Sequence, residues 1–278
     1  MQSTGVLTGL LGALSFGSGD FAGASAARRA GALATVAGTH GIGFLALLIA
    51  LAIVRPPVPG VEAVGFGIAA GVAGMVGLAA LYRGMSVGTM GMTTALAGSG
   101  SLVLPLAFGA IRGDPVGALQ IVGVGCAAAA AAAASGASRD ELGRGALALA
   151  GLAMLGFGAW YVLIDLAATA GDWLWAVVFS RGTSAAIAAI VVGVRGFDRS
   201  VLPWAILVAA GLLDVGGNVL FVLAREAIPI GLAAALVGLY PVVTMLLARF
   251  LIGERLPALG LLGVGLAVVG IVLISAGG

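Results

Sequence analysis

The chain has 278 residues, of which 61% are hydrophobic and only 9% charged, and its formal net charge is +2. A water-soluble domain carries roughly 25% charged residues, so this chain lacks the polar surface that a soluble protein needs. Its basic side chains are all Arg and form no cluster that would bind nucleic acid, and its single cysteine, Cys126, excludes an internal disulfide. The composition therefore predicts an all-α membrane protein with almost nothing outside the bilayer.

Ten successive segments are long and apolar enough to span a bilayer, which takes about 20 mostly apolar residues per helix. Charged residues with Gly or Pro separate most of them. The breaks at Tyr82 and Arg225 are weaker, so a nine-helix chain with one long bent segment is the alternative. The apolar runs are too long for the alternating pattern of a β-barrel. The ten segments are 5–26, 32–54, 62–82, 86–111, 116–136, 143–168, 173–194, 201–223, 227–251 and 257–276.

The two halves of the sequence match when one is shifted by 140 residues. The shift places Gly113 on Gly253 and the acidic residue Asp114 on Glu254. Chance matching in a chain rich in Gly, Ala and Leu is the alternative to a duplication. Each half holds five segments, and two copies with an odd number of spans must enter the membrane in opposite directions. We therefore predict ten transmembrane helices as two inverted repeats, 1–138 and 139–278, within one membrane domain, with a substrate site near the midplane between them.

Polar residues inside a span are costly and tend to be paired or to line water. Asp20 and His40 lie on either side of the Arg28-Arg29 turn, and at 1.5 Å per residue both come roughly 14–16 Å from it. An Asp–His pair at that depth would bind and release a proton, because His titrates near neutrality. The alternative is a structural hydrogen bond.

Three further polar groups lie in the second half. Asp214 and Asn218 are four residues apart, so they share one face of a helix. A carboxylate beside an amide would receive the amine of a zwitterion, and the alternative is a polar clamp between helices. Asp165 and Arg181 lie in neighbouring segments, and we expect them to form a structural ion pair across the hairpin.

Aromatic residues and prolines complete the candidates. Trp160, Tyr161 and Tyr240 lie within spans, and with Tyr82 they are candidates to line a substrate cavity. Pro105 and Pro241 each fall in the fourth segment of their half, where a proline removes a backbone hydrogen bond and kinks a helix. Matched kinks would act as gates, and a packing kink without a role in motion is the alternative. The candidate substrate-binding residues are Asp20, His40, Tyr82, Trp160, Tyr161, Asp214, Asn218 and Tyr240.

One stretch of the second half resembles EamA-type proteins of the drug/metabolite transporter superfamily. It runs from Leu239-Tyr240-Pro241 to Leu251-Ile252-Gly253-Glu254-Arg255 and is followed by a Gly-rich last helix. A weaker version lies between Ser101 and Gly123, and the stretch Phe16-Gly17-Ser18-Gly19-Asp20-Phe21 is also similar to members of the family. The resemblance implies a ten-helix inverted-repeat fold around a central cavity, often exporting amino acids or other small metabolites. The first half departs from the pattern, with Asp114-Pro115 where the second has Glu254-Arg255, so the two ends of the molecule are chemically unequal.

Loop charges predict the orientation. With ten spans, eight loop-region Arg residues fall on one side and three on the other, and the positive-inside rule then places both termini at the periplasmic face of the inner membrane. A single miscounted span would reverse this.

We expect a secondary transporter that moves a small polar or amphipathic solute, with an amino acid as the best guess and export as the direction. Its partners would be the solute, the lipid bilayer and protons, without nucleic acid. No motif indicates a cofactor, a metal site or a P-loop for ATP. A catalytic set is also lacking, which disfavours an enzyme. A membrane sensor without transport and an intramembrane enzyme are the alternatives.

Overall fold

The computed structural model describes residues 2–114, 117–123, 125–126, 129, 143–195, 202–254 and 258–276. All regular structure in these residues is helical, as the sequence predicts. Residues 118–123 are also helical, but most of the expected segment 116–136, and the boundary between the halves at 138, lie outside the described residues. The elements are α1 (Gln2–Ala30), α2 (Ala32–Val54), α3 (Val61–Val87), α4 (Met90–Ser101), α5 (Val103–Ile111), α7 (Gly143–Ala170), α8 (Trp173–Arg195), α9 (Trp204–Ala227), α10 (Ile230–Val237), α11 (Tyr240–Leu251) and α12 (Ala258–Ala276).

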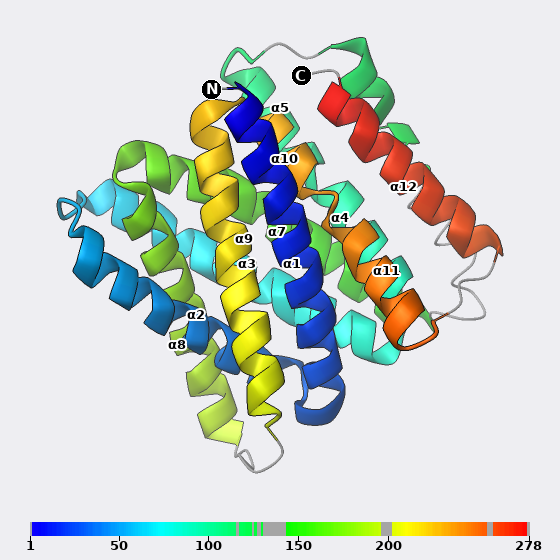
Figure 1. Cartoon of the computed structure of the whole chain (residues 1–278), viewed down its shortest axis with the longest axis horizontal. Coiled ribbons are helices and arrows are strands. Elements are labelled where there is room, and N and C mark those ends of the chain that lie inside the picture. The colour runs from blue at the N-terminus through cyan, green and yellow to red at the C-terminus, as the bar shows by residue number, and fades with distance from the viewer. Residues whose placement is uncertain are drawn as a thin grey trace.

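Glycine and proline end the helices where the sequence places them. Gly31, with φ +82°, makes the reversal between α1 and α2, a conformation that a side chain would oppose. Arg55 ends α2 in the left-handed conformation, and Pro56 and Pro57 follow it. Chain reversals of one to six residues thus connect α1, α2 and α3, so these helices run antiparallel to one another. The first described residue and the end of α12 lie at the same end of the molecule, which is called the termini end below (Figure 1).

The fourth span of each half is interrupted near its middle, although the residues at the interruption keep right-handed helical dihedral angles. A break at Leu102 separates α4 from α5, and a break at Gly238-Leu239 separates α10 from α11. Pro105 and Pro241 lie in the first turn of the piece after the break, where the missing N–H of proline costs no helical hydrogen bond. The two breaks are not equivalent, because α4 has 12 residues and α10 only 8.

Helix ends recur at an interval of 140 residues. The ends of α1 and α7 (Ala30, Ala170) and of α3 and α9 (Val87, Ala227) differ by this interval, and so do the starts of α4 and α10 (Met90, Ile230) and the ends of α5 and α11 (Ile111, Leu251). The glycine two residues after each fourth span has a positive φ, +97° at Gly113 and +68° at Gly253. The repeat predicted from residue identities therefore recurs in the positions of helix ends.

The helices pack in pairs that combine the two halves of the chain. α1 packs on α9, α3 on α7 and α2 on α8 (Figure 1). Small residues bring these backbones together: a Cβ at Gly156 in α7 would lie 2.6 Å from the Cα of Gly77 in α3, and one at Gly71 would lie 2.5 Å from the carbonyl oxygen of Ser180 in α8. Close approach through small residues is the usual way in which membrane helices associate.

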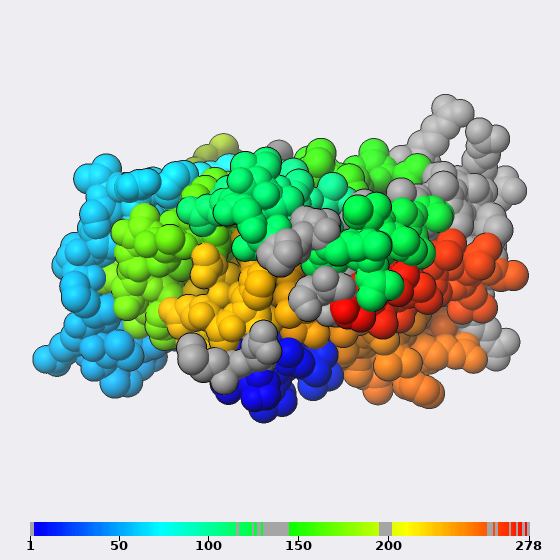
Figure 2. Space-filling model, turned by 90° about the horizontal axis from the view of Figure 1, so that it is seen from above, coloured from blue at the N-terminus to red at the C-terminus, as the bar shows by residue number. Residues whose placement is uncertain are grey.

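The outer surface of the bundle is apolar. Ile49 and Ile53 on α2, Ile190 on α8 and Phe250 on α11 are each more than 60% exposed, which suits contact with lipid. Seen from above, α2 and α12 lie at opposite ends of the molecule (Figure 2). Among the described residues, seven helical stretches are long and apolar enough to cross a membrane: 32–54, 61–87, 90–111, 145–170, 173–194, 204–227 and 230–251.

Candidate functional site

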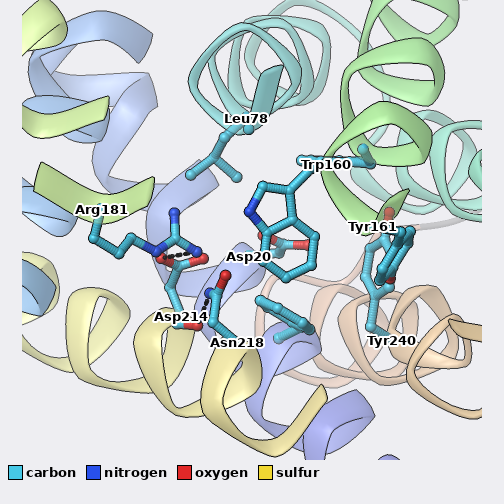
Figure 3. Close-up of a pocket in the computed structure, with 11 residues that line it drawn as sticks. Asp20, Leu78, Trp160, Tyr161, Arg181, Asp214, Asn218 and Tyr240 are labelled. Atoms are coloured by element: carbon cyan, nitrogen blue, oxygen red, sulfur yellow. Dashed lines mark hydrogen bonds and ion pairs between the residues drawn. The ribbon is translucent and has the colours of Figure 1, made fainter. Parts of the chain in front are cut away.

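A small, mainly apolar cavity that also contains a few charged and polar side chains lies between the two halves of the chain. It encloses ≈ 40 Å³, room for about three water molecules at 10–15 Å³ each. Arg181 and Asp214 face each other on one side of it, and Trp160, Tyr161 and Tyr240 lie toward the other side (Figure 3). The lining residues, which define the central cavity below, are Phe16, Asp20, Gly74, Leu78, Phe157, Trp160, Tyr161, Arg181, Asp214, Asn218 and Tyr240.

The lining comes from equivalent positions of the two halves. With the 140-residue shift, Gly74 corresponds to Asp214 and Leu78 to Asn218, and with one extra residue in α7, Phe16 corresponds to Phe157 and Asp20 to Tyr161. At the two lining positions where α9 is the counterpart of α3, the second half has a polar side chain and the first half has glycine or leucine. The cavity is therefore symmetric in position but not in chemistry.

A buried ion pair forms the polar side of the cavity. Arg181 on α8 binds Asp214 on α9, with 2.9 Å between Nη2 and Oδ2, and each side chain is only 5% exposed. This arrangement corrects the expected pairing of Arg181 with Asp165. Asp165 instead binds Arg225 and Arg112 at the termini end, whereas Arg181 reaches Asp214 on α9.

His40 supports this pair from behind, outside the cavity lining. Nη1 of Arg181 lies 2.6 Å from Nε2 of His40, and Nδ1 of His40 contacts the Ser184 hydroxyl. An arginine can only donate, so Nε2 accepts and the ring proton sits on Nδ1, which donates to Ser184. His40 also lies 3.5 Å from Asp214. The predicted Asp20–His40 pair does not form, because the ring nitrogens of His40 contact Arg181 and Ser184 and lie near Asp214.

Asp20 lies in the cavity without a protein partner. Its residue is 5% exposed, and it accepts no hydrogen bond from any side chain or amide in the described ranges. Two neighbouring polar atoms, the Nε of Arg181 and the Oδ1 of Asn218, are buried and likewise unpaired there. The predicted sharing of a face by Asp214 and Asn218 is confirmed, since the Asn218 amide donates to the Asp214 carbonyl oxygen at 2.6 Å. The cavity thus offers a carboxylate, an N–H donor and an amide oxygen to a solute.

Aromatic rings close the cavity toward the termini end. The ring of Trp160 lies 5.3 Å from that of Tyr161 and 5.5 Å from that of Phe221, and its indole N–H donates to Ser180 at 3.2 Å. The rings of Tyr161 and Phe221 are 4.8 Å apart. Trp160, Tyr161 and Tyr240 line the cavity, as expected. Tyr82 is completely buried against Gly23 of α1 and lies outside the lining.

The sequence reasoning missed Phe16, Gly74, Leu78 and Phe157 as lining residues, and it assigned Arg181 only a structural role. The 140-residue alignment carries the signal that would have found Gly74 and Leu78, since both are the counterparts of selected polar residues. As to metals, no group of three or more His, Cys, Asp or Glu side chains that could hold an ion occurs in the described residues.

Comparisons with known proteins agree with this architecture. Residues 144–276 match the EamA-like transporter family. Twelve chains of solved structures match as well. One crystal structure of a protein superposes with a TM-score of 0.69, covering 99% of this chain and 97% of the other at 18% identity, which shows a shared fold. No protein of curated function matches the sequence.

Proposed function

We propose, on the premise that this chain belongs to the EamA-like transporter family, that it is a secondary transporter whose solute binds in the central cavity. The match of residues 144–276 to that family supports a membrane transporter, and we propose its solute, its direction of transport and its mechanism. The observation that carries it is the unpaired Asp20 carboxylate, buried between the two halves beside other unpaired polar atoms.

The two halves are proposed to be inverted repeats of five spans each. The helix ends that recur every 140 residues support this, and so do contacts between the halves. The carboxylate of Glu254 accepts hydrogen bonds from the amides of Met90 and Gly91, at 3.0 and 2.9 Å. Its counterpart Asp114 lies beside Ile230, the counterpart of Met90, at the opposite end of the molecule. An exchange of equivalent contacts between opposite ends is what a two-fold axis in the membrane plane produces.

The solute is proposed to be an amino acid or a similar small polar or amphipathic molecule. Asp20 would receive its amine, the unpaired N–H of Arg181 would receive an acidic or carbonyl oxygen, and the aromatic rings would contact its apolar part. The cavity of ≈ 40 Å³ is too small for such a solute, so loading requires the halves to separate. Alternating access, in which the halves rock and expose the cavity to one side at a time, supplies that opening.

The proposed setting is the inner membrane, with both termini periplasmic and export as the direction. The excess of Arg on the loops at the end opposite the termini supports this orientation. An N-terminal tag that stays protected from protease in intact spheroplasts would contradict it.

Solute flux in proteoliposomes tests the proposal. Purified protein should move at least one member of an amino-acid and metabolite panel, and the Asp20→Asn variant should move it at least about tenfold more slowly. Empty liposomes are the control. A lack of flux across the whole panel would reject the carrier in favour of a sensor. An intramembrane enzyme is less well supported, because Nδ1 of His40 donates to Ser184 and cannot activate that hydroxyl as a nucleophile.

Proton coupling is a separate part of the proposal, based on Asp20, His40 and Asp214. A proton on Nε2 of His40 would displace the Arg181 donor and leave the imidazolium 3.5 Å from Asp214. Arg181 would then be free to move toward Asp20. Each of these three residues is replaced singly by a neutral one. If a residue carries the proton, its replacement should make solute transport independent of the pH gradient. Unchanged dependence in all three would leave facilitated diffusion or exchange.

A further inference from the structure

A second and larger cavity lies nearer the termini end. Like the central cavity, it is lined in part by α7 and α9. It has a volume of ≈ 290 Å³, and we call it the vestibule. It lies between the ends of α5, α7 and α9 and the start of α10. Its lining is Arg112, Asp114, Asp165, Arg225 and residues 226–230. The vestibule and the central cavity are therefore successive spaces along one line between the halves.

Two layers of side chains separate these spaces. The first layer is the Tyr161–Phe221 ring contact, and Phe221 is fully buried. The second layer lies one helical turn further toward the termini end, about 6 Å along each helix. There Asp165 on α7 binds Arg225 on α9. The same two helices thus carry an aromatic contact and an ion pair, one above the other.

Arg112 joins the ion pair from the end of the broken fourth span. Its Nη1 lies 3.4 Å from Asp165, and its guanidinium lies 5.1 Å from the centre of the Phe108 ring. The Asp165 side chain is 1% exposed, whereas those of Arg225 and Arg112 are 32% and 42% exposed. A buried carboxylate held by two half-exposed guanidinium groups is stable only while those groups stay in place, because a buried charge without a partner is strongly unfavourable.

Among the described residues, the equivalent place toward the opposite end of the molecule holds no such ion pair. Met85 corresponds to Arg225 at the interval of 140 residues, and Ala24 corresponds to Asp165 at the interval of 141 that places Phe16 on Phe157. Leu81, the counterpart of Phe221, is completely buried together with Ala24 and Met85 in one apolar cluster. The two equivalent places therefore differ in chemistry: one holds an ion pair and the other apolar side chains.

We infer that Asp165, Arg225 and Arg112 form the latch of the gate at the termini end, through which solute passes between the vestibule and the central cavity. This inference rests on the proposed function. Opening requires α9 and the end of α5 to move away from α7 and the charged groups to hydrate. Salt on the termini side favours the open latch, because ions screen the half-exposed arginines, while the apolar cluster toward the other end responds little to salt.

Thiol labelling of the central cavity tests the latch. A single reporter, Leu78→Cys, is placed in a Cys126→Ala background, and sealed membrane vesicles of each orientation receive a membrane-impermeant thiol reagent. Asp165→Asn should raise the labelling rate from the termini side at least about tenfold, which corresponds to about 1.4 kcal/mol. Labelling from the opposite side should not change. Arg225→Gln, which keeps Asp165 paired with Arg112, should give a smaller increase and is the second variant if Asp165→Asn does not fold.

Arg55→Gln is the matched control, since Arg55 lies at the same end of the molecule and outside the ion-pair network. Its labelling should equal that of the reporter alone. Raising the salt concentration should speed labelling of the reporter protein and have little effect on the Asp165→Asn variant. Equal rates in all variants, or increases of the same size from both sides, would overturn the latch. Solute flux together with labelling rates that the latch variants do not change would overturn the latch and leave the carrier in place. Labelling rates that the variants do change, in a protein that moves no solute, would support the latch and reject the carrier.

Discussion

Removal of Arg181 should destabilise the protein more than removal of its whole ion pair. Arg181 and Asp214 are each 5% exposed and 2.9 Å apart, so Arg181→Met leaves a buried carboxylate without its main partner. Breaking a buried pair in this way costs about 3–5 kcal/mol, whereas replacing both partners by apolar residues is often nearly neutral. We therefore expect Arg181→Met combined with Asp214→Leu to recover at least about 1 kcal/mol relative to Arg181→Met alone.

The free energy of unfolding in mixed detergent micelles, titrated with SDS, measures all four members of this double-mutant cycle. Arg249→Met is the control, since Arg249 lies on the exposed face of α11 and its loss should leave stability nearly unchanged. Strictly additive losses for Arg181 and Asp214 would refute the reasoning, because they would mean that the two charges do not depend on each other for burial.

Three further predictions follow from single contacts. Gly156→Ala should lower the free energy of unfolding by about 1–3 kcal/mol, because its Cβ would meet the α3 backbone. Gly151→Ala is the control, since its Cβ would lie in open space, and equal melting temperatures of the two variants would contradict the prediction. Asp20→Asn should weaken solute binding at least about tenfold in a thermal-shift titration and leave unliganded stability unchanged, since Asp20 has no partner to lose; a large loss of unliganded stability would show a structural role instead. Glu254→Gln should speed hydrogen exchange at the Met90 amide several-fold, because the charged cap of α4 is lost; unchanged exchange would mean that the cap is not maintained in the membrane.

The sequence predicts the helices well because their length and ends are local properties. Uninterrupted apolar runs require helices of membrane length, and Gly31, Pro56 and Gly113 end them through backbone geometry. Pro105 and Pro241 correctly mark irregular places in the fourth spans. The breaks themselves were not foreseen, since a proline within an apolar run is compatible with both a kink and a break.

The partners of the charged residues were predicted poorly because they depend on the rotation of each helix about its axis. Asp165 and Arg181 are neighbours along a hairpin, but a helix presents a different face every 100°, and α8 turns Arg181 toward Asp214. Of the two residues expected to pair, Asp20 lines the central cavity, while His40 faces Ser184. Comparing equivalent positions of the two halves would have predicted the residues that line the cavity better than comparing depths along neighbouring spans.

The hydrogen bonds between Glu254 and α4 have a consequence for biosynthesis. The carboxylate that caps Met90 lies 164 residues later in the chain. At about 5–20 residues per second, the ribosome delivers this acid roughly 10–30 s after the amides that it binds. The first turn of α4 must therefore wait in the membrane without its cap until synthesis has reached residue 254, so the fourth span of the first half reaches its final state only after the helices up to α11 have been made.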